Sequence, residues 1–429
     1  MSESRRSIRA LATTPISIAP RPSKRPRVAL VLSGGGARGA YEAGVLRYIC
    51  EELPLERGVR PWFDVVCGTS VGALNACYVA ATADVLDRSA ALLWARWLEL
   101  RADSLLRLRP LDAFRLVRSM LGGPPMQIER TPDESGRRHG GIIDTSELER
   151  FVLHSVPWSR IRRNVESGAL EALSVSATHV TSGKTVVFVD SARPLPPWSR
   201  DPHVMPLHTR IGPFHALASA AIPVLFPPIA LDGSWYVDGG LRQNTPLSPA
   251  IRLGADRVLV VSLRHRRPHG FNPEPTVDVS AVPSPFFLAG KALNALLIDR
   301  IDYDLDRLRH MNAIIDAGVE MTGPEFVARL NERLSVRTGT PVRHVRDMLV
   351  RPSQDLGALA SEYAKSERFA ARAGVTAHGF RRLAERDAGD DSDLLSYLLF
   401  DGDFSKQLLE LGRDDARARR DELAALFTE

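Results

Sequence analysis

The chain has 429 residues, of which 44% are hydrophobic and 25% charged, with 56 Lys and Arg against 51 Asp and Glu. These proportions exclude a chain that is disordered throughout and a collagen-like repeat, and the length suggests two or three domains that can each bury a core. The three cysteines (Cys50, Cys67 and Cys77) are too few for a disulfide scaffold. Their odd number and their lack of metal-type spacing favour a reducing, cytoplasmic compartment.

A basic arm, residues 1–26, precedes the first expected strand. Residues 1–28 hold seven Lys and Arg against one acid, Glu3, a net charge of +6 (7 − 1), so the overall +5 leaves −1 for the remainder. Prolines at positions 15, 20, 22 and 26 argue against a helix, and the arm has no apolar core of a secretory signal. We expect a disordered arm that contacts an anionic membrane surface, and no nucleic-acid partner.

Two strand–turn–helix units follow. The apolar run 28–32 predicts a strand buried on both faces, and a glycine-rich turn leads from it into a helix that ends near residue 52. The run 63–67 predicts a second strand, followed by another glycine-rich turn and a helix that ends near residue 81. Two such units indicate an α/β fold with its chemistry at the carboxyl ends of the strands.

The rest of the chain divides into an insertion, further α/β elements and a helical end. Residues 92–141 are helical but interrupted, which predicts a lid or cap over the site. Further elements are expected as a helix from the cap residues 144–146, strands at 173–177 and 185–189, a helix near 214–221, a hairpin around 232–233 and a strand at 257–262. A domain is therefore expected at 27–265, a proline-rich linker at 266–285, and a mainly helical region without clear strands at 286–429.

The first glycine-rich turn fits more than one function. Gly34, Gly36 and Gly39 have the spacing of a dinucleotide-binding fingerprint between a strand and a helix. Three acids stand where a ribose ligand could be: Glu51, Glu52 and Asp64. A tight turn without any ligand is the alternative, and the fingerprint alone is too common to identify a function.

The second turn, GTSVG at 68–72, has the spacing of a nucleophile elbow. Ser70 at a strained turn would project its hydroxyl clear of the backbone, while Gly68 and Gly72 remove side chains that would collide with neighbouring elements. The helix that begins at Val71 would point its N–H groups at Ser70 and favour a developing oxyanion. A serine that only caps the helix is the alternative.

A nucleophilic serine needs a base, and no histidine stands in an obvious position for one. His310, His344 and His378 fall in the helical C-terminal region, where a solvent-exposed or helix-capping role explains them better than catalysis. Instead, Asp238 ends a β-like run and is followed by Gly239 and Gly240. On its own, Asp-Gly-Gly is an ordinary turn.

The order of these motifs resembles the patatin-like phospholipase family, in its bacterial branch. A strand followed by GGGARG, a strand followed by GTSVG, and DGG 168 residues after the serine (238 − 70) occur in sequence. The segments 218–228 and 244–246 around the DGG add to the resemblance, which covers about residues 27–263. It implies a three-layer α/β/α hydrolase core as the catalytic domain.

The resemblance also implies the chemistry. Ser70 matches the family nucleophile and Asp238 its general base, a dyad that needs neither histidine, metal nor cofactor. The oxyanion-hole loop would be Gly34, Gly35, Gly36, Ala37, Arg38 and Gly39, with Gly35 and Gly36 as the main donors and the Val71 N–H assisting. The expected activity is cleavage of fatty acyl esters of membrane phospholipid or lysophospholipid through an acyl-enzyme.

Several alternatives stay open at this point. The same dyad could serve an acyltransferase or a thioesterase. A dinucleotide-binding protein and a non-catalytic scaffold are further hypotheses. The helical region 286–429 could bind a partner or a second copy of the chain. Arg38 could meet a lipid phosphate or hold the loop by pairing with a carboxylate or carbonyl. The apolar stripe Trp94, Trp97, Leu98 and Leu100 could contact acyl chains or be plain core.

Overall fold

The structure, a computed structural model, describes residues 25–101, 107–108, 143–195, 198, 202–265, 300–338, 341–371 and 392–428. Three sequence predictions fall wholly or largely outside these residues. They are the basic arm at 1–26, the lid insertion at about 92–141 and the proline-rich linker at 266–285.

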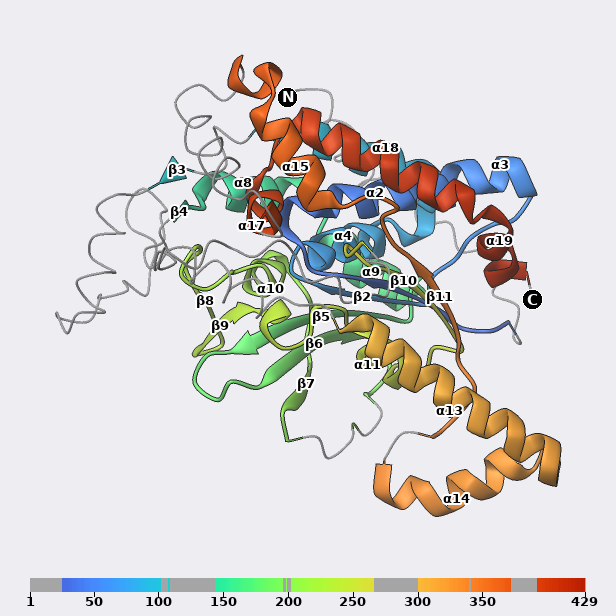
Figure 1. The fold of residues 1–429 in the computed structure, drawn as a ribbon. Coiled ribbons are helices and arrows are strands. Elements are labelled where there is room, and N and C mark those ends of the chain that lie inside the picture. The colour runs from blue at the N-terminus through green and yellow to red at the C-terminus, as the bar shows by residue number, and fades with distance from the viewer. Residues whose placement is uncertain are drawn as a thin grey trace, which may run out of the picture.

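A nine-stranded, mostly parallel sheet forms the centre of the molecule (Figure 1). Its main path runs β11-β10-β1-β2-β5-β6-β7, and the antiparallel pair β8 and β9 joins it through β5. The strands are β1 (Val28–Leu32), β2 (Val65–Thr69), β5 (Ala172–His179), β6 (Thr185–Ser191), β7 (Val204–His208), β8 (Ile229–Leu231), β9 (Ser234–Asp238), β10 (Arg257–Val261) and β11 (Arg346–Val350). Each predicted strand and the predicted hairpin are present; a separate short pair consists of β3 (Arg107–Leu108) and β4 (Ile143–Asp144).

Helices cover both faces of the sheet. On one face lie α2 (Gly39–Arg47), α4 (Val71–Ala81), α5 (Leu86–Leu98), α8 (Ser146–Ser155), α9 (Ser159–Ser167), α10 (Pro213–Ser219), α15 (Leu356–Lys365), α17 (Ser392–Leu398), α18 (Gly402–Ala418) and α19 (Arg420–Thr428). On the other lie α11 (Leu247–Arg252) and α13 (Ile301–Thr322), and α14 (Phe326–Thr338) folds back along α13. The remaining short helices are η1 (Gly36–Arg38), η2 (Tyr48–Glu52), α3 (Leu53–Arg57), η3 (Ala83–Val85) and η4 (Gly239–Leu241).

The alternation of side chains in β1 explains the three layers. Val28, Leu30 and Leu32 point into the larger core, whereas Ala29 and Val31 point into the smaller core under α11 and α13. All five residues are fully buried, which matches a parallel strand covered on both faces. The expected α/β/α architecture is confirmed.

One expectation for the C-terminal region is wrong, because it contains a strand. Residues 346–350 form β11, which pairs in parallel with β10 at the edge of the central sheet. Arg346 and Asp347 begin this strand, and only Met348, Leu349 and Val350 are buried. Charged residues at the start of a short edge strand hide the apolar pattern that identifies a strand in a sequence.

Helix α18 of the same region packs closely along α2 (Figure 1). A Cβ atom at Gly412 would lie 2.1 Å from the backbone oxygen of Tyr41, and one at Gly44 would lie 2.1 Å from that of Leu409. The two helix backbones therefore touch at glycines, and the C-terminal helix is part of the main core rather than a loosely attached element.

Gly412→Ala is expected to destabilise the protein by about 1–3 kcal/mol, because the new methyl group pushes two packed backbones apart. Urea unfolding monitored by circular dichroism measures the change. The matched control is Gly212→Ala, where a Cβ atom meets nothing within 4 Å. Equal unfolding midpoints for the two variants would contradict the close packing of α2 and α18.

Within the described ranges, none of the helices combines the length and the apolar character needed to cross a bilayer.

Candidate active site

Ser70 occupies a strained turn between β2 and α4. Its φ of 55° and ψ of −126° are a conformation that non-glycine residues rarely adopt. A Cβ atom at Gly68 would lie 2.3 Å from the backbone oxygen of Gly72, so a larger residue does not fit this turn. The Ser70 N–H donates to the Ser219 hydroxyl at 2.8 Å, and that hydroxyl donates to the Ser176 carbonyl at 2.6 Å. These two bonds hold the turn in place from the neighbouring strand.

Asp238 comes to Ser70 from the end of β9, which pairs with β5. The Ser70 hydroxyl donates to Asp238 Oδ2 at 2.7 Å, and the Gly240 N–H donates to the other carboxylate oxygen, also at 2.7 Å. The carboxyl group is fully buried. Burial raises the pKa of Asp238 to about 7, although the hydrogen bonds from Ser70 and Gly240 oppose the rise. The group can therefore take up or release a proton near neutral pH.

The glycine-rich loop lies against Ser70. A Cβ atom at Gly34 would lie 3.1 Å from Ser70 Cβ and 2.3 Å from Asn244 Oδ1. The Gly34 N–H already donates to the Asn244 carbonyl at 3.0 Å, while Asn244 Nδ2 donates to the Gly34 carbonyl at 3.1 Å. Gly34 thus shapes the loop, and its N–H is not free to bind an oxyanion.

The remaining loop residues have two roles: some present a backbone N–H group, and others pack against neighbouring side chains. Among the described residues, none accepts a hydrogen bond from the backbone N–H of Gly35, Gly36 or Val71. Gly36 has a φ of +56°, and a Cβ atom there would lie 2.2 Å from the backbone oxygen of Tyr397, so this position requires glycine. Ala37 is buried in the core, and Gly39 packs against the Val71 side chain.

The Arg38 side chain is buried against α17. Its Nε donates to the Ser396 hydroxyl at 2.6 Å, and its guanidinium lies 4.4 Å from the centre of the Tyr397 ring. Arg38 therefore ties the loop to α17. This favours the structural interpretation of Arg38.

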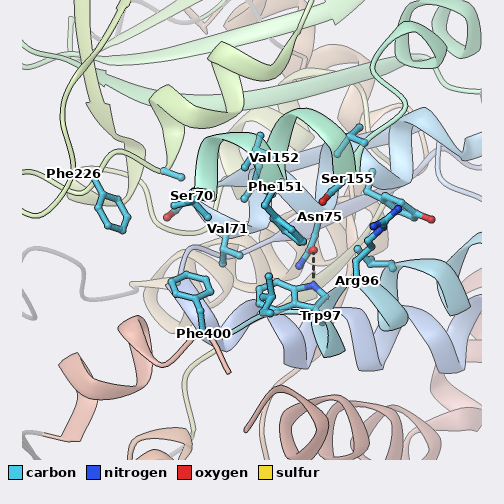
Figure 2. Close-up of a pocket in the computed structure, with 18 of the residues that line it drawn as sticks. Ser70, Val71, Asn75, Arg96, Trp97, Phe151, Val152, Ser155, Phe226 and Phe400 are labelled. Carbon is cyan, nitrogen blue, oxygen red and sulfur yellow. Dashed lines mark hydrogen bonds between the residues drawn. The ribbon is translucent and has the colours of Figure 1, made fainter. Parts of the chain in front are cut away.

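An apolar pocket opens beside Ser70 (Figure 2). It contains about 750 Å³ of empty space, counted together with its opening to solvent. Its lining comes from the first glycine-rich loop, the Ser70 turn, α4, α5 and α8 with the residues that follow α5 and α8, the segment before β8 and one C-terminal residue: Gly36, Ser70, Val71, Leu74, Asn75, Tyr78, Leu93, Arg96, Trp97, Leu100, Leu148, Phe151, Val152, Ser155, Val156, Ala220, Ile222, Phe226 and Phe400. Such a pocket suits a hydrocarbon chain attached at Ser70.

Several of these wall residues had no individual signal in the sequence. Of the apolar stripe considered above, Trp97 and Leu100 line the pocket, whereas Trp94 and Leu98 do not. The spacing of Leu148, Phe151, Val152 and Ser155 is that of one helix face, but this face looks the same whether it covers a core or a cavity. Only the fold shows that it faces Ser70.

No histidine lines this pocket, and the described portion of the chain contains no cluster of three or more His, Cys, Asp and Glu side chains that could hold a metal ion. His344 Nε2 instead lies 3.6 Å from Asp316 Oδ2, and both residues are far along the chain from the site residues. The carboxylate of Asp238 is therefore the titratable group in contact with the Ser70 hydroxyl.

Fold and site together define an α/β protein with a strained serine at the end of a parallel strand, hydrogen-bonded to a buried aspartate beside a glycine-rich turn. A family model described as Patatin-like phospholipase matches residues 30–251, just over half of the chain. The chain belongs to the patatin-like phospholipase family, as its motif order indicated.

Curated relatives match over slightly more than half of the chain. A protein of Mycobacterium tuberculosis described as an uncharacterized NTE family protein is 27% identical over 261 residues, which is 58% of this chain and 52% of that protein. A cGAMP-activated phospholipase of Pseudomonas aeruginosa is 27% identical over 217 residues, 51% of this chain and 53% of that protein. The chain thus spans about half the length of the curated relatives it matches.

Two solved structures match at lower sequence identity and with low TM-scores. VipD from Legionella pneumophila is 13% identical with a TM-score of 0.25, and the match covers 89% of this chain and 92% of VipD. ExoU, in its complex with SpcU from Pseudomonas aeruginosa, is 16% identical with a TM-score of 0.27, covering 87% of this chain and 69% of that one.

Proposed function

We propose that this protein is a serine acyl hydrolase that cleaves fatty acyl esters of phospholipid or lysophospholipid, using Ser70 as nucleophile and Asp238 as general base. The observation that carries the proposal is the 2.7 Å hydrogen bond from the hydroxyl of the strained Ser70, which lines an apolar pocket, to the buried Asp238 carboxylate. Membership of the patatin-like phospholipase family supports lipid as the substrate class.

The reaction would run in two halves. In the first, Ser70 Oγ forms a bond to the ester carbonyl carbon while its proton passes to Asp238 Oδ2. The tetrahedral intermediate then loses the alcohol, which takes the proton from Asp238 and leaves an acyl group on Ser70. In the second half, a water molecule gives its proton to Asp238 and attacks the acyl carbon, and Ser70 leaves with that proton as the fatty acid departs.

Backbone groups would stabilise the oxyanion in both halves. The Gly35, Gly36 and Val71 N–H groups have no acceptor among the described residues, and Gly36 lines the pocket together with Ser70. Val71 also begins α4, whose positive dipole end favours negative charge at this point. One such donor typically contributes roughly 3–4 kcal/mol to transition-state stabilisation.

The proposal also covers where the protein acts in the cell and what it contacts. We infer cytoplasmic, peripheral association with an anionic membrane through the basic residues 1–26, because residues 1–24 hold five Lys and Arg against one acid. Arg25 and Arg27 instead pair with Asp64 and Glu171. Contact between copies of the chain would use the C-terminal helices, since α13 leaves Tyr303, Met311, Ile314 and Met321 exposed. No site residue suggests a nucleic-acid partner.

There are two alternatives to hydrolysis of the oxygen esters of lipids. An acyltransferase or thioesterase would use the same dyad, and transfer of the acyl group from Ser70 to an added alcohol in place of water would reveal the former. A dinucleotide site is less well supported, because its candidate acids already have protein partners: Glu51 with Arg47 and the Ala91 N–H, Glu52 with Arg417, and Asp64 with the Val28 N–H.

The test is the release of free fatty acid from vesicles that contain a panel of phospholipids and lysophospholipids. We expect release by the purified protein and none above background by Ser70→Ala. Equal release by both proteins would refute hydrolysis at Ser70. A purely non-catalytic scaffold would release nothing in either case.

A further inference from the structure

Arg96 is a buried cation in the wall of the apolar pocket. It belongs to α5 and is only 6% exposed, yet it lines the same cavity as Ser70. In Figure 2, Ser70 and Arg96 lie on opposite sides of Phe151 and Trp97. The pocket therefore has the candidate nucleophile toward one end and a positive charge toward the other.

The guanidinium of Arg96 is only partly satisfied. Nη1 donates to Glu99 Oε2 at 3.0 Å, but Nε and Nη2 are buried and have no hydrogen-bond partner among the described residues. The other nearby acid, Glu51, is already bonded to Arg47 and to the Ala91 N–H. Buried donors of a charged group without partners are costly, and native proteins usually complete them with water, an ion or a ligand.

The length of the pocket follows from helix α4. Ser70, Val71, Leu74, Asn75 and Tyr78 all line it, so the pocket follows one face of this helix for about two turns. Eight residues at about 1.5 Å each place Tyr78 about 12 Å from Ser70 along the helix axis. Burial raises the pKa of Tyr78, and the nearby charge of Arg96 opposes that rise, which places Arg96 at the Tyr78 end.

The wall between the two ends is hydrocarbon. Val71, Leu74, Trp97, Phe151 and Val152 supply it, and the only hydrogen bond marked there joins Trp97 Nε1 to Asn75 within the wall (Figure 2). Carbon–carbon bonds of about 1.5 Å at about 111° advance an extended chain by about 1.25 Å each, so about nine or ten carbons span 12 Å. A chain of that length attached at Ser70 would bring its far end to Arg96.

We propose that the pocket accepts an acyl chain of about nine carbons whose far end carries a hydrogen-bond acceptor, a carboxylate above all, and that Arg96 binds that end. The proposal rests on the acyl hydrolase function and specifies its substrate class. Phospholipid acyl chains shortened by oxidation end in groups of this kind. The chemistry at Ser70 is unchanged, and Arg96 acts only by binding the far end of the chain.

The test compares three p-nitrophenyl esters on the same protein preparations: the nonanoate, the 9-hydroxynonanoate and the monoester of nonanedioic acid. We expect kcat/KM of the wild-type protein for the carboxylate-ended ester to exceed that for the nonanoate by at least about tenfold. Arg96→Met should remove this preference, and Arg96→Lys should retain part of it. Each ratio is taken within one variant, so partial misfolding cancels.

The outcomes separate this proposal from the acyl hydrolase function. Arg96 is supported as the binding group if the wild type prefers the 9-hydroxynonanoate or the nonanedioic acid monoester over the nonanoate and Arg96→Met loses that preference. Comparison of the hydroxyl-ended ester with the carboxylate-ended one shows whether a negative charge is needed. A ratio that is the same in the wild type and in Arg96→Met overturns it.

If no protein hydrolyses any ester, the hydrolase function fails, and binding then decides the Arg96 proposal. Monomethyl nonanedioate should raise the melting temperature of Ser70→Ala more than methyl nonanoate does, and Arg96→Met in the same background should abolish that difference. Equal shifts by the two ligands in Ser70→Ala would overturn the Arg96 proposal as well.

Discussion

Ser70→Ala is expected to lower fatty acid release by at least about 10⁴-fold, because the reaction loses the atom that forms the acyl-enzyme. Titrated fatty acid release from a good vesicle substrate measures the loss. The Ser70 hydroxyl donates to Asp238 and its N–H donates to Ser219, and only the first of these bonds is lost in the variant. The fold should therefore persist, and a near-normal circular dichroism spectrum is the control.

Ser70→Gly gives a matched comparison, since it removes the hydroxyl and also relieves the strain. The φ of 55° at Ser70 is unfavourable for alanine but not for glycine. We expect both variants to be equally inactive and Ser70→Gly to unfold at a higher temperature than Ser70→Ala. Residual activity of Ser70→Ala within tenfold of the wild type would show that Ser70 is not the nucleophile.

Asp238→Asn is expected to reduce kcat by about 10³-fold or more, because the amide cannot accept the proton that Ser70 releases. In the wild-type protein, only the ionised carboxylate can act as a base. With the pKa of Asp238 raised to about 7 by burial, kcat should fall about tenfold per pH unit below pH 7 and level off above it. A pH profile that stays flat from pH 5 to pH 9 would contradict this role.

Ionisation of Asp238 should have opposite effects on activity and on stability, because it raises kcat but lowers the free energy of unfolding. An unfolded aspartate ionises near its ordinary pKa of 3.8, whereas folded Asp238 keeps its proton up to about pH 7. The folded state therefore binds more protons between these values, and the wild-type protein loses stability as the pH rises through this window. Asp238→Asn has no such loss, so it should be more stable than the wild type above pH 7, by up to about 4 kcal/mol, and similar to it near pH 4. Urea unfolding at pH 4 and pH 8 measures both differences.

Much of the fold was predictable because its strands are short, buried and bounded by glycine. The run at 28–32 reads as a strand covered on both faces, and β1 is fully buried. The turns at 34–39 and 68–72 were predictable because their glycines stand where a Cβ atom meets backbone or a neighbouring side chain. Strand β11 was missed because Arg346 and Asp347 begin it and the apolar run is only three residues long.

The candidate site was predictable only as a set of motifs. Ser70 and Asp238 stand 168 residues apart, and their pairing was expected from the motif order of the family rather than from either motif alone. The aspartate reaches the serine because β9 pairs with β5, which itself neighbours β2. Local sequence patterns carry no information on such pairing between distant strands.

The features that the sequence determined and those that only the tertiary structure decided differ for a physical reason. The sequence by itself determined the two glycine-rich turns, the serine and the aspartate, because these depend on backbone conformation and chemistry within a few residues. Only the tertiary structure decided that Arg38 is tied to Ser396, that α18 belongs to the main core and that Arg96 shares a pocket with Ser70. Each of those contacts joins separate helices or loops, and packing between them depends on the whole fold.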